Sequence, residues 1–303
     1  MGKESKGLQK HCITTVVSGN KYQDFIPLFV YSINRYYPEV DIHIFIKGSL
    51  NKKVKDQIKD MSCKIHDKCF EEYIDLPSMS NSLRFLVPSS IFMGYTSTYI
   101  TDIDFIFFRQ EKPYYKYFMD VVLKSGQPYA AVAGAPRFPK RPHVTPSWSG
   151  KFLRTAAGSV LLTPEWFRKT KRARNIYREI LRGERSEKID NILPASYREY
   201  DEVMFCRLCR EAGLKVPSGK KYTFLTGKSI NSKYRHIHLG DFKFKKRYSS
   251  MSKMKRILHS KNVRQYDKMK EDPKWLELVK GSCDRIKDMV ANLNKHVYKR
   301  LHK

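Results

Sequence analysis

The stretch Tyr-Ile-Thr-Asp-Ile-Asp-Phe-Ile-Phe-Phe at residues 99–108 places two carboxylates, Asp102 and Asp104, inside an apolar segment that favours β-structure. A carboxylate without a partner costs several kcal/mol to bury, so a strand that ends in Asp-x-Asp needs a cation to neutralise it. Mn²⁺ and Mg²⁺ prefer oxygen ligands, take one or two carboxylates and leave positions for water and substrate phosphates. The pattern predicts a metal-diphosphate site. The alternative is a strand end whose acids face water.

Strand and helix patterns alternate ahead of this stretch. β-branched and alternating runs predict strands, and apolar helical spacing predicts helices, at residues 12–17 (strand), 25–36 (helix), 41–46 (strand) and 51–61 (helix). Such an order is typical of βαβ units with a parallel sheet. Ligands of these sheets bind beyond the carboxyl ends of the strands, where Thr14, Thr15 and the two acids are expected.

Three segments together resemble nucleotide-sugar glycosyltransferases of the GT-A fold. They are residues 83–88 (LRFLVP), 99–104 (YITDID) and 157–162 (AGSVLL), and the resemblance spans residues 11–245. It is closest to glycogenin-like and galactosyltransferase-like enzymes and to small glycosyltransferases of large algal DNA viruses. The resemblance implies an α/β, Rossmann-like domain with a mostly parallel sheet flanked by helices.

The resemblance also implies a donor site. Its cofactor is Mn²⁺ or Mg²⁺, held by Asp102 and Asp104, and of the two we favour Asp104 as the direct ligand. Its donor is a nucleoside-diphosphate sugar, and we favour a UDP-sugar. The residues implied to contact the donor or its diphosphate are Thr14, Thr15, Val16, Tyr22, Arg84, Asp102 and Lys243. For the residues in and after the first strand, the alternative is ordinary packing.

A second acidic group, Asp201 and Glu202, begins an apolar helical pattern. Acids are favoured in the first turn of a helix by its dipole, so a helix start without chemistry is one reading. Members of the family place an acidic residue at the matching point, beside the anomeric carbon or the acceptor hydroxyl. The resemblance therefore implies Asp201 as the first candidate for the catalytic carboxylate and Glu202 as the second. In an inverting enzyme such a group takes the proton of the acceptor hydroxyl. In a retaining enzyme it orients substrate.

Residues 235–243 (RHIHLGDFK) approximate the His-x-x-Gly-x-x-Lys pattern of glycogenin-like enzymes. The pattern is not matched in full, because Ile237 occupies the histidine slot when Gly240 and Lys243 are aligned. His236 and His238 flank that slot, and alternation along a strand would turn both toward one face. We favour His238 as the metal ligand. A solvated His-x-His strand is the alternative.

Two further features have open interpretations. Residues 134–150 contain four prolines and Trp148, which predicts a long loop that forms a lid or acceptor rim, unless Trp148 packs in the core. Cys206 and Cys209 have the spacing of half a zinc site or a redox pair, with Cys63 and Cys69 as the other pair. Without a disulfide framework, reduced thiols are expected.

Composition predicts one large core, since 41% of the 303 residues are apolar. The net charge of +29 increases along the chain, from +3 in residues 1–100 to +17 in residues 201–303. We expect a glycosyltransferase domain at 1–245 and, at 246–303, a basic linker with an amphipathic helix. That helix docks on the domain, lies on an anionic membrane, or binds a partner or polyanion. The absence of an apolar leader or membrane-length run predicts a cytoplasmic protein, including one peripheral to membranes or in a virus-infected cell.

The predicted function is therefore metal-dependent transfer of a sugar from a nucleoside-diphosphate sugar to a hydroxyl of a glycan or glycoprotein. A nucleic-acid-binding protein that uses the basic carboxyl third is one alternative. A metal-dependent phosphohydrolase or nucleotidyltransferase is another, although the sequence shows no further acid cluster for a second metal. Dinucleotide and P-loop motifs are absent from the sequence.

Overall fold

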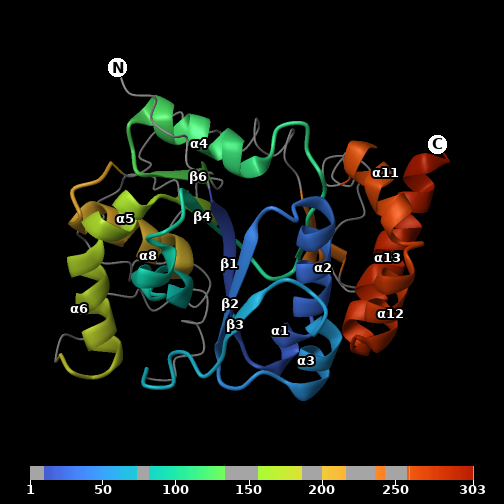
Figure 1. Cartoon of the computed structure of the whole chain (residues 1–303), viewed down its shortest axis with the longest axis horizontal. Coiled ribbons are helices and arrows are strands. Elements are labelled where there is room, and N and C mark those ends of the chain that lie inside the picture. Colours follow the sequence, from blue (N-terminus) through green and yellow to red (C-terminus); the bar gives the residue numbers. More distant parts are fainter. Residues whose placement is uncertain are drawn as a thin grey trace, which may run out of the picture.

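The computed structural model describes residues 10–73, 82–133, 156–185, 200–215, 236–242, 258 and 260–302. Within these ranges the chain forms a six-stranded sheet, a separate two-stranded sheet, and helices on both sides of the larger sheet (Figure 1). The predicted α/β architecture is confirmed.

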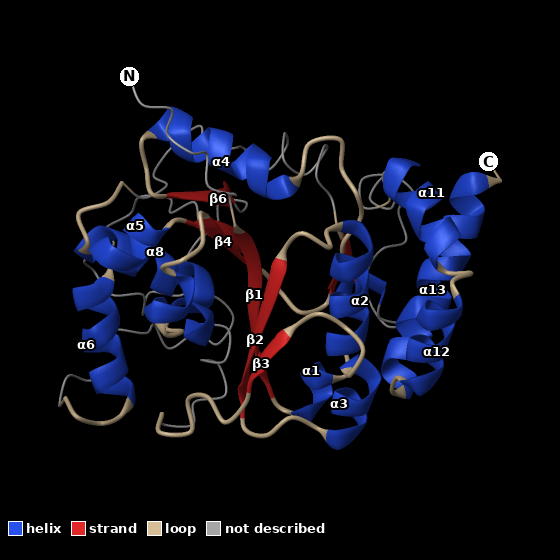
Figure 2. Cartoon of the chain, in the orientation of Figure 1, coloured by secondary structure: helices blue, strands red, loops and turns tan. Residues whose placement is uncertain are grey.

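The larger sheet has the strand order β3-β2-β1-β4-β7-β6. Strands β3, β2, β1 and β4 are parallel neighbours, whereas β7 runs antiparallel to both β4 and β6. The sheet is thus mostly parallel, as predicted, and Figure 2 shows its twist in red. The strands are β1 (His11–Ser18), β2 (Asp41–Lys47), β3 (Lys64–His66), β4 (Ser97–Ile100), β6 (Tyr129–Ala133) and β7 (Ala156–Leu162).

The strand register determines which residues share the carboxyl edge of the sheet. Thr14 of β1 lies opposite Ile100 of β4, and Thr15 lies opposite Ile44 of β2. Because these strands are parallel, the turn after β1 and the acidic segment after β4 leave the sheet at the same edge. This edge contains the site described below.

Two apolar clusters cover the two faces of the sheet. One joins the sheet to α2 and α4, and the other joins it to η1, η2, α5, α6 and α8. Figure 1 shows α2 and α3 on one side and α5, α6 and α8 on the other. The helical elements are α1 (Asn20–Gln23), α2 (Ile26–Tyr36), α3 (Lys52–Ile58), η1 (Ser82–Phe85), η2 (Ser89–Phe92), α4 (Tyr114–Ser125), α5 (Pro164–Lys169), α6 (Lys171–Leu181) and α8 (Tyr200–Glu211).

Three helices near the carboxyl end pack on α2 rather than extending away from the sheet. They are α11 (Ser260–Met269), α12 (Pro273–Gly281) and α13 (Asp284–Leu301), and they lie beside α2 in Figure 1. Trp275 of α12 is 1% exposed, and its ring lies between those of Tyr31 and Tyr266, with centroids 5.9 and 6.0 Å away. These helices share one apolar cluster with the sheet. The boundary predicted at 245–246 lies outside the described residues.

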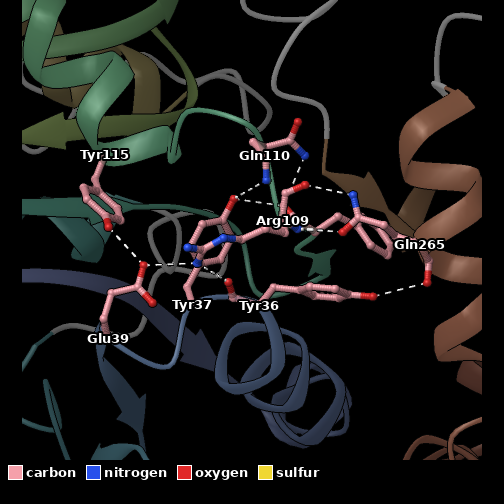
Figure 3. Close-up of polar contacts among 8 residues, drawn as sticks. Tyr36, Tyr37, Glu39, Arg109, Gln110, Tyr115 and Gln265 are labelled. Atoms are coloured by element: carbon pink, nitrogen blue, oxygen red, sulfur yellow. Dashed lines mark hydrogen bonds and ion pairs between the residues drawn. The ribbon is translucent and has the colours of Figure 1, made fainter.

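A polar network joins α11 to the chain that follows β5 (Phe105–Ile106) (Figure 3). The side chain of Gln265 accepts from the backbone N–H of Arg109 at 2.9 Å and donates to its carbonyl oxygen at 2.8 Å. The Arg109 guanidinium donates to the carbonyl oxygen of Tyr36 at 2.7 Å and pairs with Glu39 at 3.3 Å. The network therefore links the end of α2, the segment after β5, and α11.

The described helices include none that is both long and apolar enough to cross a lipid bilayer. All six cysteines carry free thiols, as expected. Cys206 and Cys209 are buried in α8, and Cys209 accepts a hydrogen bond from the Trp166 indole at 3.3 Å. Cys63 and Cys69 pack against different apolar clusters. The four thiols therefore do not gather into a zinc site.

Candidate functional site

Asp102 and Asp104 lie in a turn rather than within a continuous strand. β4 ends at Ile100, and β5, which begins at Phe105, belongs to the second sheet, where it pairs with β8 (Ile237–His238). The backbone N–H of Thr101 donates to the carbonyl oxygen of Thr14 at 3.1 Å, which keeps the chain beside β1 up to the first acid. The acid pair therefore marks the junction of the two sheets at the carboxyl edge.

Arg84 forms an ion pair with Asp102. Its Nη1 lies 2.7 Å from Oδ1 of Asp102, and the Arg84 side chain is 6% exposed against 34% for the acid. A charge-assisted hydrogen bond of this length is among the stronger polar contacts in proteins. Arg84 is carried by η1, a 3₁₀ turn. The pair fixes Asp102 at the rim of the site.

His238 lies between two other carboxylates. Its Nε2 is 2.9 Å from Oδ2 of Asp104, and its Nδ1 is 3.4 Å from Oδ1 of Asp241. Burial opposes the charged imidazolium, but the hydrogen bonds and negative charges of the two acids prevail and raise the pKa of His238 to about 10. The protonated imidazole of His238 is therefore the cation that neutralises Asp104 in this structure.

Gly240 makes the close approach of Asp104 and His238 possible. A Cβ atom at this position would lie 2.7 Å from Oδ2 of Asp104 and 3.1 Å from the His238 ring. The backbone N–H of Leu239 also donates to the carbonyl oxygen of Asp104 at 2.8 Å. The segment after β8 therefore wraps tightly around the second acid.

His236, the other candidate ligand, lies in an aromatic environment. Its ring centroid is 3.9 Å from that of Phe107, with Tyr99 and Tyr114 also nearby. Its Nδ1 is buried without a hydrogen-bond partner, and burial lowers the pKa of His236 to about 3. His236 precedes β8, so the alternation expected along a strand does not place it beside His238. The structure brings His238, not His236, to the acids.

The residues predicted to contact the nucleotide differ in exposure. Thr14 and Thr15 are buried in β1, and the hydroxyl of Thr14 has no hydrogen-bond partner within the described ranges. Val16 is half-buried, whereas Tyr22 in α1 is 44% exposed. The side chain of Gln23 ties this turn to the one after β2, because it donates to the carbonyl of Ser49 at 3.0 Å. Tyr22 is thus presented at the carboxyl edge.

Several predicted residues lie outside the described part of the chain. They are Trp148, Lys243 and the side chains of Asp201 and Glu202. The helix predicted to begin near the last two is present as α8, which packs against η1 through Phe205 and Phe85, with ring centroids 5.2 Å apart.

Two arginines that sequence reasoning missed hold the turn that carries Arg84. Arg174, which is fully buried, donates from Nε to the carbonyl of Phe85 at 2.8 Å and from Nη2 to the carbonyl of Val87. Arg178 donates to the carbonyl of Leu86 at 2.9 Å. Both belong to the Lys-Arg-Ala-Arg-Asn-Ile-Tyr-Arg stretch of α6, whose many charged residues resemble a solvated helix face and so give no sign of burial.

The acidic turn has the donor chemistry of a hard divalent ion with few protein ligands. In the described part of the chain, no three acidic, histidine or cysteine side chains gather closely enough to hold an ion alone. An ion that completes its shell with phosphate oxygens and water needs only one or two protein carboxylates. Asp104 and His238, with Asp102 beside them, fit such an ion.

A hollow of about 640 Å³ between α3 and α12 lies apart from these residues. It is lined by polar side chains that include Lys52, Asp56 and Glu277. None of the predicted site residues lines it. Its location gives no support for a catalytic role.

No family model and no curated protein matches this sequence. Among solved structures, the chain is similar to the galactosyltransferase LgtC in complex with donor and acceptor sugar analogues, with 12% identity, 64% of this chain and 69% of that chain covered, and a TM-score of 0.40. It is also similar to core-mannan synthase A from Aspergillus fumigatus in an Mn/GDP form, with 8% identity, 69% and 71% covered, and a TM-score of 0.43.

The bifunctional glycosyltransferase WbbM matches over 92% of this chain and 53% of its own, with 12% identity and a TM-score of 0.48. Glycosyltransferases are thus among the structures that this chain resembles. Because identities and TM-scores are low, we base the functional proposal on the acidic turn and its neighbours.

Proposed function

We propose that this chain is a metal-dependent glycosyltransferase that moves a sugar from a nucleoside-diphosphate sugar to a hydroxyl of a glycan or glycoprotein. The observation that carries the proposal is the acidic turn at the carboxyl edge, where Asp104 contacts His238 and Asp102 pairs with Arg84. We favour a UDP-sugar as the donor. The motif resemblance noted in the sequence supports the same class.

Each side chain of the turn has a role in this proposal. Asp104 and the neutral imidazole of His238, after loss of the proton that it shares with Asp104, would hold Mn²⁺ or Mg²⁺, with Asp102 as the second carboxylate. The bound metal supplies Lewis-acid stabilisation of the leaving diphosphate. Arg84 orients Asp102 and adds positive charge beside the donor. Lys243, the residue after η4 (Leu239–Phe242) in the sequence, is our candidate for a contact with the diphosphate.

The nucleotide lies at the end of β1, beside Thr14, Thr15, Val16 and Tyr22. The catalytic acid comes from the first turn of α8, where Asp201 is our first candidate and Glu202 the second. The contact of α8 with η1 supports this assignment, because η1 also carries Arg84. In an inverting reaction the carboxylate accepts the proton of the acceptor hydroxyl.

Thermal stability with nucleotides tests the proposal. The protein is melted with UDP, GDP or dTDP, each with and without Mn²⁺, and the series is repeated on Asp104→Ala and on the matched surface control Asp120→Ala. A ligand at a hundredfold its dissociation constant stabilises by about 2.7 kcal/mol. We expect metal-dependent stabilisation by one diphosphate in the wild type and in Asp120→Ala, but not in Asp104→Ala.

Product analysis separates the transferase from other metal enzymes that use paired acids. With a nucleotide sugar as substrate, transfer or hydrolysis by this site releases the nucleoside diphosphate. Release of the nucleoside monophosphate, or failure of every diphosphate to stabilise the protein, would contradict the proposed function.

A further inference from the structure

Helix α13 contacts both ends of the carboxyl edge. At its start, the thiol of Cys283 lies beside the Asp24 carboxylate, in the turn that follows α1. Further along, the Asn292 amide donates to the carbonyl of Phe242 at 3.1 Å, in the η4 segment just after His238. One helix therefore links the turn after β1 to the segment that holds Asp104.

Arg285, in the first turn of α13, lies against two aromatic rings and has no carboxylate partner among the described residues. Its Cζ lies 5.9 Å from the ring centroid of Tyr22 and 5.8 Å from that of Phe25. Its Nη1 is buried without a hydrogen-bond partner, and within the described residues no carboxylate pairs with it. Leaving a buried donor without an acceptor costs free energy.

The two aromatic contacts only partly offset this cost. A cation over an aromatic ring gains a modest electrostatic stabilisation. An unsatisfied buried donor loses more than this, above all when it is charged. The Arg285 side chain is only half-buried, so the rest of its guanidinium can meet an acceptor that arrives from outside the chain.

The position of Arg285 indicates what that acceptor is. Tyr22 follows the carboxyl end of β1, which is the strand next to β4, so Arg285 and the acidic turn lie at one edge of the sheet. The helix from Arg285 to Asn292 covers roughly 10 Å at 1.5 Å per residue. A nucleotide whose diphosphate lies at Asp104 would extend along this edge toward Tyr22. Tyr22 is 44% exposed and therefore accessible to it.

We propose that Arg285 is a nucleotide-binding residue whose guanidinium donates to an oxygen of the nucleoside diphosphate at the carboxyl edge of β1. This inference rests on the proposed function and extends it, because it makes α13 part of the donor site. The oxygen belongs either to a phosphate or to the base and ribose.

Calorimetric titration with UDP and Mn²⁺ tests the role of Arg285. Arg285→Met keeps the aliphatic stem on the two rings and removes the charge. Arg300→Met removes the same charge from the exposed far end of α13 and is the matched control. Loss of a charge-assisted hydrogen bond weakens binding about tenfold to a hundredfold. We expect this loss in Arg285→Met and wild-type affinity in Arg300→Met.

Shorter ligands identify the oxygen that Arg285 contacts. If it is a phosphate oxygen, the loss in Arg285→Met appears with UDP and UMP but disappears with uridine. If it is on the base or ribose, the loss persists with uridine. The variant Arg285→Lys is measured as well, because it keeps the charge without the planar fork and decides the matter if Arg285→Met fails to fold.

Equal UDP affinity for wild type and Arg285→Met, or for wild type and Arg285→Lys if only that variant folds, would overturn the role of Arg285. The proposed function would survive that result, because metal-dependent UDP binding to the wild type would remain. If the wild type binds no diphosphate with Mn²⁺, both proposals fail.

Discussion

Arg174 donates from its Nε to the carbonyl oxygen of Phe85, 2.8 Å away, and has no carboxylate partner among the described residues. Burial, together with the nearby charge of Arg178, lowers the pKa of Arg174 to about 9, so the side chain still carries a proton at neutral pH. Its hydrogen bonds go to the backbone of the turn that carries Arg84. A buried cation is thus used to fix a loop next to the acids.

Substitution of Arg174 by methionine should destabilise the protein and loosen that turn. The carbonyls of Phe85 and Val87 lose a donor, at a cost of about 1–3 kcal/mol in the free energy of unfolding, measured by urea denaturation. Diphosphate binding should weaken as well, because Arg84 loses its support. Arg172→Met on the exposed face of α6 should change neither quantity. A wild-type binding constant in Arg174→Met would show that the turn holds without it.

Alanine at Gly240 should disrupt the site while leaving the fold intact. The new Cβ would lie 2.7 Å from Oδ2 of Asp104, so the carboxylate must rotate away from His238. We expect metal-dependent diphosphate binding to fall by at least about tenfold, as when a ligand loses its supporting contacts. The free energy of unfolding should change by less than about 1 kcal/mol, because Gly240 is not in a left-handed conformation. Gly94→Ala, with open space around it, is the control.

His43 should make the protein less stable in acid. Its ring contacts His66 at 3.0 Å and the Tyr95 hydroxyl at 2.8 Å. Burial and the charges of His66 and Lys64 lower the pKa of His43 to about 4, and the opposing effect of the Asp41 carboxylate is smaller. Between that value and 6.5, the unfolded chain binds more protons than the folded one. The contribution of His43 is therefore complete above pH 6.5 and is lost as the pH falls toward 4.

Urea denaturation at several pH values measures this effect. The variant His43→Gln cannot take up the proton, so its stability should fall less steeply between about pH 6.5 and 4 than that of the wild type. His302→Gln at the exposed end of α13 should keep the wild-type slope. Equal slopes for all three proteins would mean that His43 does not contribute.

Trp275 should be essential to the attachment of the helices near the carboxyl end. Its buried ring packs between Tyr31 of α2 and Tyr266 of α11. Truncation of a buried tryptophan to alanine costs about 3–5 kcal/mol, which urea denaturation detects readily. The neighbouring Leu276 is 52% exposed, so Leu276→Ala should stay within about 0.5 kcal/mol of the wild type. Similar stabilities for the two variants would show that α12 adds little to the core.

Local periodicity was sufficient to predict the elements of the amino-terminal half. The runs at 12–17, 25–36 and 41–46 correspond to β1, α2 and β2 within one residue at each end, because each alternates or repeats its apolar residues with a clear period. These elements depend mainly on contacts with their immediate neighbours in the sheet.

The features missed depend on partners distant in sequence. Residues 99–108 look like one strand, yet the chain divides after Ile100 because β5 pairs with β8. Thr163 precedes Pro164 as an N-cap should, but its hydroxyl donates to the carbonyl of Pro128 at 2.9 Å instead of capping α5. The burial of Arg174 does not follow from local pattern either.

The contact of α13 with both ends of the carboxyl edge has a consequence for biosynthesis. The strands and the acidic turn leave the ribosome long before the helix that bridges them. A nascent chain therefore carries Asp104 and Tyr22 without their final neighbours, and the proposed nucleotide site is incomplete until α13 has emerged and docked. Translation that stops within α13 would yield a chain whose proposed donor site lacks one wall.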